Sequence, residues 1–330
     1  MTGGSTRAAE HDHASAARAR ERRWWLLVAV GALVVVASYV GLVLTPAGQA
    51  VENAALRGAD QVGAQARTDS DEALASVTVA SLAVACVVIA VVGLLRRSIP
   101  LATAALGTVV ASLLVTEVLK RVVLRRPALV EASAAYTGNS FPSGHTTIAL
   151  GVLAAALLLA TWRSRGVVMF FVASWAVAIA GYTITSKWHR LSDTLGSAGI
   201  VLVVASLAAL WLHRRGLVRR VETGGHRARI WLVVVPLVLS LLVGVGLAVV
   251  LLVATGDLLD RDPVTEDNVF LAFQLLAGVG SVATTLALWW SWHRLEVATP
   301  PDDVARRPLG RTPPVDRSTP TRSTPTRSAT

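Results

Sequence analysis

The chain has little of what a soluble enzyme usually carries. Only one of its 330 residues is a cysteine, so an internal disulfide and a metal site built from cysteines are both excluded. Charged residues make up only 16% of the sequence, against about 25% in ordinary soluble domains. The sequence contains no cluster of metal ligands and no nucleic-acid-binding motif, so we expect no metal, no cofactor and no nucleic-acid partner.

Long uncharged runs are what the sequence has instead. Hydrophobic residues make up 53% of it and the mean hydropathy is +0.57. The apolar segments are approximately 24–44, 73–95, 100–119, 146–162, 167–186, 194–213, 230–255 and 268–293. Runs of about 20 apolar residues are typical of transmembrane helices, whereas the buried helices of soluble proteins seldom stay uncharged for so long. The sequence therefore predicts an all-α fold, a polytopic membrane helical bundle of about eight transmembrane helices.

The loop charges predict the orientation of these helices. The net charge is +10, and most of the arginines lie between the apolar runs or at the termini. Arginines follow the second, fourth, sixth and eighth runs, on the side of the basic N-terminus: Arg96, Arg97, Arg163, Arg165, Arg214, Arg215, Arg219, Arg220, Arg306 and Arg307. Because cytoplasmic loops are enriched in lysine and arginine, we expect a multi-pass cell-membrane protein with both termini in the cytoplasm.

Composition divides the chain into five parts. Residues 1–23 are arginine-rich, and residues 294–330 are rich in proline, threonine, serine and arginine. Neither has an apolar period, so both are predicted to be disordered cytoplasmic tails. Between them we expect a core of six helices over 24–213, a basic cytoplasmic loop over 214–229 and two additional transmembrane helices over 230–293.

A basic cluster from Lys120 to Pro127 lies on the outer side, where the charge rule disfavours it. Lys120 and Arg126 come at the end of an apolar run, and Pro127 stops a helix. Arginine can hold a phosphoryl group through its planar fork and lysine as a point charge. Taken alone, the cluster is also compatible with snorkelling side chains that anchor a helix at the membrane surface.

A second segment, Pro142, Ser143, Gly144 and His145, directly precedes an apolar run. Proline followed by serine and glycine indicates a helix start. A helix N-terminus offers free N–H groups and the positive end of the helix dipole to an anion. Ser143 adds a hydroxyl, and Gly144 allows close approach of the backbone. His145 would then lie beside a bound phosphate and is a candidate for acid–base catalysis.

The third segment contains His189 and Asp193, four residues apart, a spacing that places two side chains on one face of a helix. A carboxylate bonded to one imidazole nitrogen fixes the tautomer and leaves the other nitrogen free to attack. His-x-x-x-Asp is common by chance. Its weight comes from its position between two apolar runs, on the same predicted side as the other two segments.

In this order and at these intervals, the three segments resemble the signature of the type 2 phosphatidic acid phosphatase superfamily. That superfamily contains integral membrane lipid phosphate phosphatases and, more distantly, the vanadium haloperoxidases. The resemblance implies a phosphatase-type helical core. It also implies roles for three residues: His189 is the nucleophile that forms a phosphohistidine, Asp193 orients it, and His145 is the general acid.

The resemblance further implies that Lys120, Arg126, Ser143 and Gly144 hold the phosphate oxygens, and Arg125 is expected to share this contact. Two positions depart from the family pattern. Five residues rather than six separate Lys120 from the Arg-Pro pair. Thr183 lies six residues before His189, where the family has an arginine, and Lys187 and Arg190 are the nearest cations that could replace it.

The predicted function is that of a metal-independent integral membrane phosphatase acting on the outer face. Its substrate would be a lipid phosphate monoester or diphosphate, and phosphatidic acid, phosphatidylglycerophosphate and a polyprenyl diphosphate fit equally well. The expected partners are this lipid and the surrounding membrane lipids; the sequence indicates no oligomeric state. The alternative is a non-catalytic membrane protein that binds lipid phosphate, which Thr183 favours. A transporter fits less well, because the spans show no repeated pattern of glycine or proline breaks.

Overall fold

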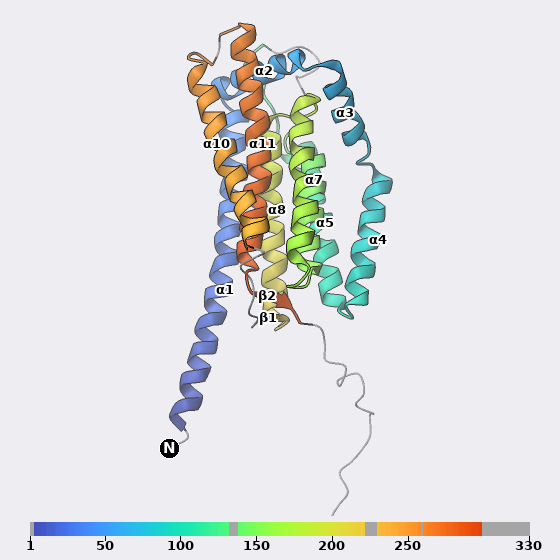
Figure 1. The fold of residues 1–330 in the computed structure, drawn as a ribbon, viewed down its shortest axis with the longest axis vertical. Helices are drawn as coiled ribbons and strands as arrows, with labels where there is room; N and C mark the ends of the chain where they lie inside the picture. The colour runs from blue at the N-terminus through green and yellow to red at the C-terminus, as the bar shows by residue number, and fades with distance from the viewer. Residues whose placement is uncertain (1–2, 132–137, 222–229, 259, 299–330) are drawn as a thin grey trace, which may run out of the picture. The chain divides into compact units, whose positions relative to one another are not determined.

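The computed structural model of the chain describes residues 3–131, 138–221, 230–258 and 260–298 (Figure 1). Part of the predicted basic loop, 222–229, and most of the predicted C-terminal tail, 299–330, lie outside the described residues. The elements follow in chain order: α1 (Gly3–Ser38), η1 (Tyr39–Val43), α2 (Pro46–Gly58), η2 (Ala59–Gln61), α3 (Ala64–Ala75), α4 (Val79–Leu95), α5 (Ile99–Val118), η3 (Leu119–Val123), α6 (Gly144–Leu159), α7 (Arg165–Thr185), α8 (Leu191–Arg214), β1 (Val218–Arg220), η5 (Ile230–Val234), α10 (Val235–Ala254), α11 (Pro263–Ser291) and β2 (Leu295–Val297).

Polar caps set the points at which several helices begin. The Thr78 hydroxyl accepts the N–H of Ser81 at 3.1 Å, and the Ser81 hydroxyl accepts the N–H of Thr78 at 2.8 Å. This reciprocal pair is a capping box that starts α4. Ser98 and Asp262 cap α5 and α11 in the same way, each through a side-chain oxygen that accepts N–H groups of the first turn. These helices therefore begin at their capping residues and not at the first residue of each predicted apolar run.

The all-α membrane fold is confirmed by the long apolar helices. Six helices within the described residues are long and apolar enough to cross a membrane: Arg18–Val43, Ile99–Val123, Arg165–Thr185, Leu191–Arg214, Trp231–Ala254 and Pro263–Ser291. A seventh crossing results if α3 and α4, bent by 55°, form one broken span. Helix α6 is apolar but has only 16 residues. The predicted number of about eight exceeds the six or seven spans counted among the described residues, because the predicted run 146–162 forms the short helix α6.

The described elements differ from the predicted boundaries at three places. Helix α1 starts at Gly3, so the predicted disordered tail over 1–23 is helical from there, consistent with its alanines, arginines and glutamates, which have high helix propensity. The predicted span 73–95 is interrupted, because Thr78 caps a new helix. Residues 295–297, predicted within a disordered tail, form β2, which pairs antiparallel with β1 and is buried.

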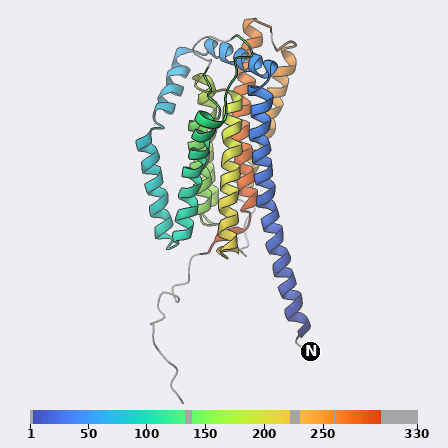
Figure 2. The same cartoon turned by 180° about the vertical axis from the view of Figure 1, so that it is seen from behind.

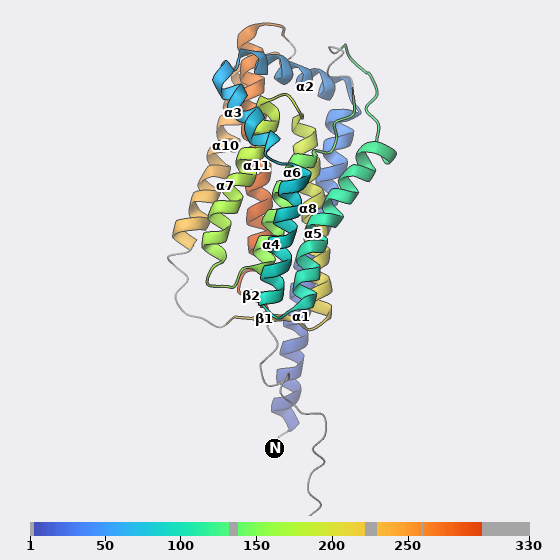
Figure 3. The ribbon, with the colours of Figure 1, turned by 90° about the vertical axis from the view of Figure 1, so that its right-hand side faces the viewer.

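The long helices alternate in direction, so both ends of the described chain lie on the same side of the bundle, with α1 extending far beyond it (Figures 1 and 2). Helix α1 leads from the N-terminus to the end of the bundle where α2 crosses, and the later helices run back and forth between the two ends (Figure 3). We call these the α2 end and the β-ribbon end, after β1 and β2. The β-ribbon end contains the turns with Arg96, Arg163 and Arg214, as the loop charges predict; which end faces the cytoplasm stays a prediction.

Helix α8 is the central helix, and α10 lies at the periphery. In the span window of α8 67% of residues are buried, against 11% for α10. Helix α8 packs against α1, α5, α6 and α11. A Cβ atom added at Gly31 would lie 2.6 Å from the carbonyl oxygen of Gly199, and the reverse holds equally, so only glycine permits this close approach of α1 and α8. The third segment therefore starts the most enclosed helix of the bundle.

Candidate active site

The third segment forms the turn that leads into α8. His189 Nδ1 lies 3.1 Å from Asp193 Oδ2, and the same oxygen accepts the N–H of Arg190 at 2.9 Å. Asp193 is fully buried in the first turn of α8, where the helix dipole favours a negative charge. An Nδ1–H that donates to Asp193 leaves Nε2 unprotonated. The pair thus has the geometry of an oriented nucleophile or base.

The contact between these two residues forms by a different route than the predicted one. They were expected on one face of a helix, but His189 precedes α8 and Asp193 reaches back to it across the helix start. Lys187 adopts φ 60, a left-handed conformation that turns the chain out of α7. The N–H of His189 then donates to the carbonyl oxygen of Thr183 at 3.1 Å. A helix cap and a tight turn, rather than helical spacing, bring imidazole and carboxylate together.

The second segment caps α6 and is tied to α8. Ser143 is the N-cap residue, and its Oγ accepts the N–H of Thr146 at 3.3 Å. The Ser143 N–H donates to the carbonyl oxygen of Asp193 at 3.0 Å, and the Ser197 hydroxyl donates to the Ser143 carbonyl oxygen at 2.7 Å. These bonds hold the N-termini of α6 and α8 side by side. Two helix N-termini therefore point toward the same end of the bundle.

His145 lies close to His189. The two imidazole ring centroids are 6.1 Å apart, and the Trp188 ring stands edge-on to His145 with centroids 5.2 Å apart. Gly144 leaves the start of α6 open, since an added Cβ would meet only Glu117 Oε1 at 3.8 Å. The structure thus brings together the two histidines that the sequence places in different segments.

The first segment separates its two arginines. Arg126 is buried, and both of its terminal nitrogens lie 3.1 Å from Glu52 Oε2. Arg125 is exposed, with its backbone N–H and carbonyl oxygen bonded to the Tyr39 hydroxyl. Side chains of neighbouring residues in extended chain point to opposite sides. Of the two predicted candidates, Arg126 therefore points inward, and the expectation that Arg125 shares the site does not match its position.

Lys120 lies in η3, at the end of the α5 span, and is partly buried. Among the described residues it forms no ion pair with a carboxylate, although Glu117 and Asp193 are close enough to act on its charge. Asn139 connects this region to the second segment, because its Nδ2 donates to the carbonyl oxygens of Lys120 and Leu124, each at 3.0 Å. The ammonium group of Lys120 is consequently available to an anion.

Glu52 is a site residue that the sequence analysis missed. Its side chain is fully buried in α2, and its Oε1 accepts the N–H of Ser192 at 3.0 Å while Oε2 faces Arg126. Burial, together with the charge of Asp193, raises the pKa of Glu52, and Arg126 and Ser192 oppose this effect. One carboxylate thus links the first segment to the start of α8.

The polar face of α2 fixes the first segment as a whole. Gln49 Nε2 donates to the carbonyl oxygen of Pro127 at 2.7 Å, and Asn53 Nδ2 donates to that of Glu131 at 3.4 Å. Gln49, Glu52 and Asn53 follow the i, i+3, i+4 spacing of one helix face. This spacing, in a short helix otherwise rich in alanine, is the signal that could have identified α2.

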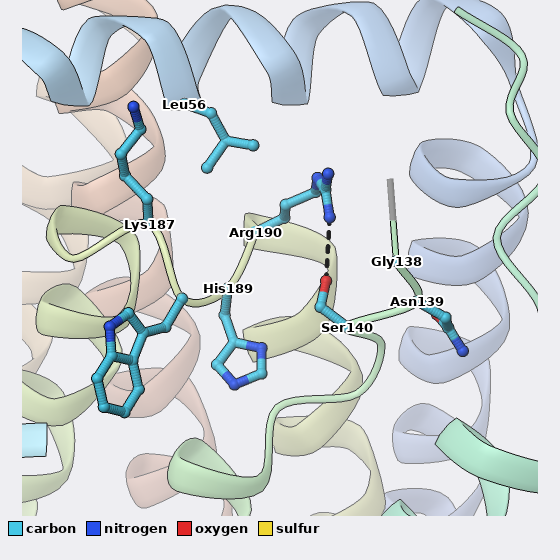
Figure 4. Close-up of a pocket in the computed structure, with 8 residues that line it drawn as sticks. Leu56, Gly138, Asn139, Ser140, Lys187, His189 and Arg190 are labelled. Carbon is cyan, nitrogen blue, oxygen red and sulfur yellow. Dashed lines mark hydrogen bonds between the residues drawn. The ribbon is translucent and has the colours of Figure 1, made fainter. Parts of the chain in front are cut away.

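A cavity of about 330 Å³ lies beside His189 (Figure 4). Its lining includes Asn139, Ser140, Lys187 and Arg190 together with His189, beneath Leu56 of α2. Figure 4 shows the side chains of Lys187 and Arg190 extending toward α2, while the His189 ring points the other way. Two cations and the histidine therefore border one polar space.

The position of the missing arginine is closed. Thr183 is fully buried, and its hydroxyl donates to the carbonyl oxygen of Ala180 at 2.8 Å. Lys187 forms an ion pair with Asp60, and Arg190 donates to the Ser140 hydroxyl at 3.1 Å. Lys187 and Arg190 therefore supply positive charge to the cavity from the turn between α7 and α8. The position of Thr183 on α7, where the family has an arginine, supplies none.

Comparison with known proteins gives one match. Residues 101–217 match the family model of the PAP2 superfamily. This stretch contains all three segments, from η3 to the first turn of α8. No curated protein and no solved structure matches the chain. The match and the long apolar helices support a membrane protein with a phosphatase-type function. Within the described residues, no group of three or more histidine, cysteine, aspartate or glutamate side chains could hold a metal ion.

Proposed function

We propose, from the match of residues 101–217 to the family model of the PAP2 superfamily, that the chain is a metal-independent phosphatase that removes phosphate from a lipid through a phosphohistidine. The observation that carries this proposal is the convergence of two histidines from separate segments, with ring centroids 6.1 Å apart, beside the N-termini of α6 and α8. A helix N-terminus is a ready anion site, and imidazoles suit nucleophilic and acid–base work near neutral pH.

In the proposed first step, His189 Nε2 attacks the phosphorus atom of the lipid phosphate. The P–N bond forms as the bond between phosphorus and the leaving oxygen breaks. His145 gives its proton to that oxygen, so the lipid leaves as an alcohol or as a lipid monophosphate. Asp193 accepts the Nδ1–H of His189 throughout and stabilises the positive charge that develops on the ring.

In the second step, water attacks the phosphohistidine. His145, now neutral, takes a proton from the water, the P–N bond breaks, and inorganic phosphate leaves. The charge on the transferring group is spread over its three equatorial oxygens, so catalysis depends chiefly on positioned cations and N–H groups. We assign this holding role to Lys120, Arg126, the Ser143 hydroxyl and the backbone N–H of Gly144.

A lipid substrate is proposed because the site lies at the end of an apolar bundle. An amphiphile can keep its chains in the membrane while its phosphate reaches the α2 end. The loop charges support an orientation in which this end lies on the outer face of the cell membrane. Lys187 and Arg190, which border the cavity of His189, are suited to a second phosphate of a diphosphate or to the negative charge of a larger headgroup.

The test is phosphate release by the purified protein from three lipids: phosphatidic acid, phosphatidylglycerophosphate and a polyprenyl diphosphate. We expect turnover on at least one of them, and a loss of more than about 10³-fold for His189→Ala, because the nucleophile is removed. His213→Ala, which removes an imidazole from the opposite end of α8, is the matched control and should keep most of the activity.

Two results would contradict the proposal. Equal phosphate release by wild type and His189→Ala would reject the assigned nucleophile. Binding of all three lipids without turnover of any would favour the non-catalytic alternative, in which Thr183 at the arginine position marks a site that binds lipid phosphate but does not cleave it.

A further inference from the structure

The β-ribbon end contains a second cavity, of about 300 Å³, far along the bundle from His189. Its lining includes four arginines and one histidine: Arg20, Arg23, Arg220, His293 and Arg294. No carboxylate belongs to this lining within the described part of the chain. The charges come from three separate places in the sequence, which the fold brings to one point.

Helix α1 contributes two of these arginines from one face. Arg20 and Arg23 are three residues apart, a spacing that places side chains next to each other on a helix. The following residue, Trp24, is fully buried against Trp292, with ring centroids 5.8 Å apart. Arg23 is held over the Trp290 ring at 5.5 Å from its centroid. Aromatic packing therefore fixes this part of α1 against the end of α11.

The two neighbouring arginines of the two-stranded ribbon point to opposite faces of it. Arg219 is opposite Glu296 and pairs with it at 2.6 Å on one face. Arg220 is opposite Leu295, and both line the cavity on the other face. Successive residues of a strand point to opposite faces. One arginine of the ribbon is therefore neutralised and the next is directed into the cavity.

The lining arginines differ from their neighbours in having no carboxylate partner among the described residues. Arg214 and Arg219 pair with Glu21 and Glu296, at 3.6 and 2.6 Å. None of the four lining arginines forms an ion pair with another described residue. Arg20 Nε is buried and lacks a hydrogen-bond partner in the part of the chain that the structure describes. Like charges gathered in one cavity repel each other, and a bound anion would relieve this repulsion.

We propose that this cavity binds a phosphate-bearing anion, either the headgroup of an anionic lipid or a soluble phosphate. Guanidinium groups match phosphate oxygens in pairs, which a diffuse basic surface cannot do. The site is separate from the proposed catalytic chemistry. Its place at the β-ribbon end, where α1 and α11 emerge from the apolar bundle, suits a lipid headgroup at the membrane surface.

The experiment uses the full chain purified in detergent and two probes, phosphatidylglycerol and inorganic phosphate. Native mass spectrometry counts retained phosphatidylglycerol, and the shift of the thermal midpoint with each probe gives its affinity at constant ionic strength. The test variant is Arg20→Gln/Arg220→Gln. The control is Arg22→Gln/Arg163→Gln, which removes the same charge from two exposed positions. We expect at least tenfold weaker binding in the test variant and no change in the control.

Binding of phosphatidylglycerol that is lost only in the test variant supports a lipid site, and loss of a phosphate-induced shift alone supports a soluble ligand. Equal binding by test and control variants would overturn the proposal, because the basic residues would then act only as a diffuse surface charge. If the double variant does not fold, Arg220→Gln alone, at a three-residue strand, gives the same comparison.

Discussion

The two ends of the bundle use arginine in opposite ways. At the α2 end, the N-termini of α6 and α8 meet, and Arg126 is oriented there by a carboxylate beside two histidines. At the β-ribbon end, Arg96 and Arg165 donate to backbone carbonyl oxygens near the ends of α6 and α11. Helix N-termini attract anions and C-termini attract cations. The arginine at the α2 end is thus positioned beside two helix N-termini suited to phosphate chemistry, whereas Arg96 and Arg165 at the β-ribbon end bind helix C-termini and hold the fold together.

The largest expected effect is at the α2 end. Asp193→Asn preserves size but cannot hold the Nδ1–H tautomer of His189 in the same way, so we expect turnover to fall on the order of 10²–10⁴-fold. The measurement is the rate of phosphate release at saturating lipid. An unchanged thermal midpoint would show that the effect is chemical. A loss of less than about threefold would contradict the role given to this carboxylate.

A different kind of loss is expected at the β-ribbon end. Arg165 is buried and donates to the carbonyl oxygens of Trp292 and Leu295 at 2.8 and 2.9 Å. Arg165→Met leaves these carbonyls without a donor, which we expect to lower the free energy of unfolding by about 3 kcal/mol. Thermal unfolding checks this, with the exposed Arg163→Met as control. Phosphate release per folded molecule should stay unchanged. A loss of turnover without a loss of stability would contradict the assignment of Arg165 to the structure and of the chemistry to the α2 end.

The smallest effect is expected for Glu52 at the α2 end, which orients Arg126 but takes no part in the proposed chemical steps. Glu52→Gln offers one acceptor oxygen where the carboxylate offers two, so Arg126 and Ser192 cannot both be satisfied. We expect kcat/KM to fall about tenfold, mostly through KM, corresponding to one lost charged hydrogen bond. Steady-state kinetics with the exposed Glu72→Gln as control measures it. If kcat fell by as much as in Asp193→Asn, Glu52 would belong to the chemistry itself.

The sequence predicted the parts of this comparison that depend on local signals. Uncharged runs identified the helices, and the residue types of the three segments pointed to His145, His189 and Asp193, which the fold brings together. The Pro-Ser-Gly start of α6 was predictable because a helix N-terminus has its own composition. The alternating loop charges predicted that the basic turns share one end.

The parts that escaped prediction depend on distant contacts. Glu52 and Arg126 are 74 positions apart, and nothing in the sequence of the short helix α2 indicates that Glu52 pairs with Arg126. Strands β1 and β2 have three residues each, too few for a period to be recognised, and their paired residues Arg219 and Glu296 are 77 positions apart. Arg125 and Arg126 could not be told apart, because the residue that faces inward is decided by Tyr39 and Glu52, which lie far away in sequence.

The most direct test of the central claim is to trap the intermediate. Wild-type protein mixed with phosphatidic acid labelled in its phosphate, or with whichever lipid it turns over, is quenched in alkali, in which phosphohistidine survives. The labelled peptide is then identified by mass spectrometry. We expect label on His189 in the wild-type protein and none in His189→Ala. Label on another residue, or continued turnover by His189→Ala, would contradict it.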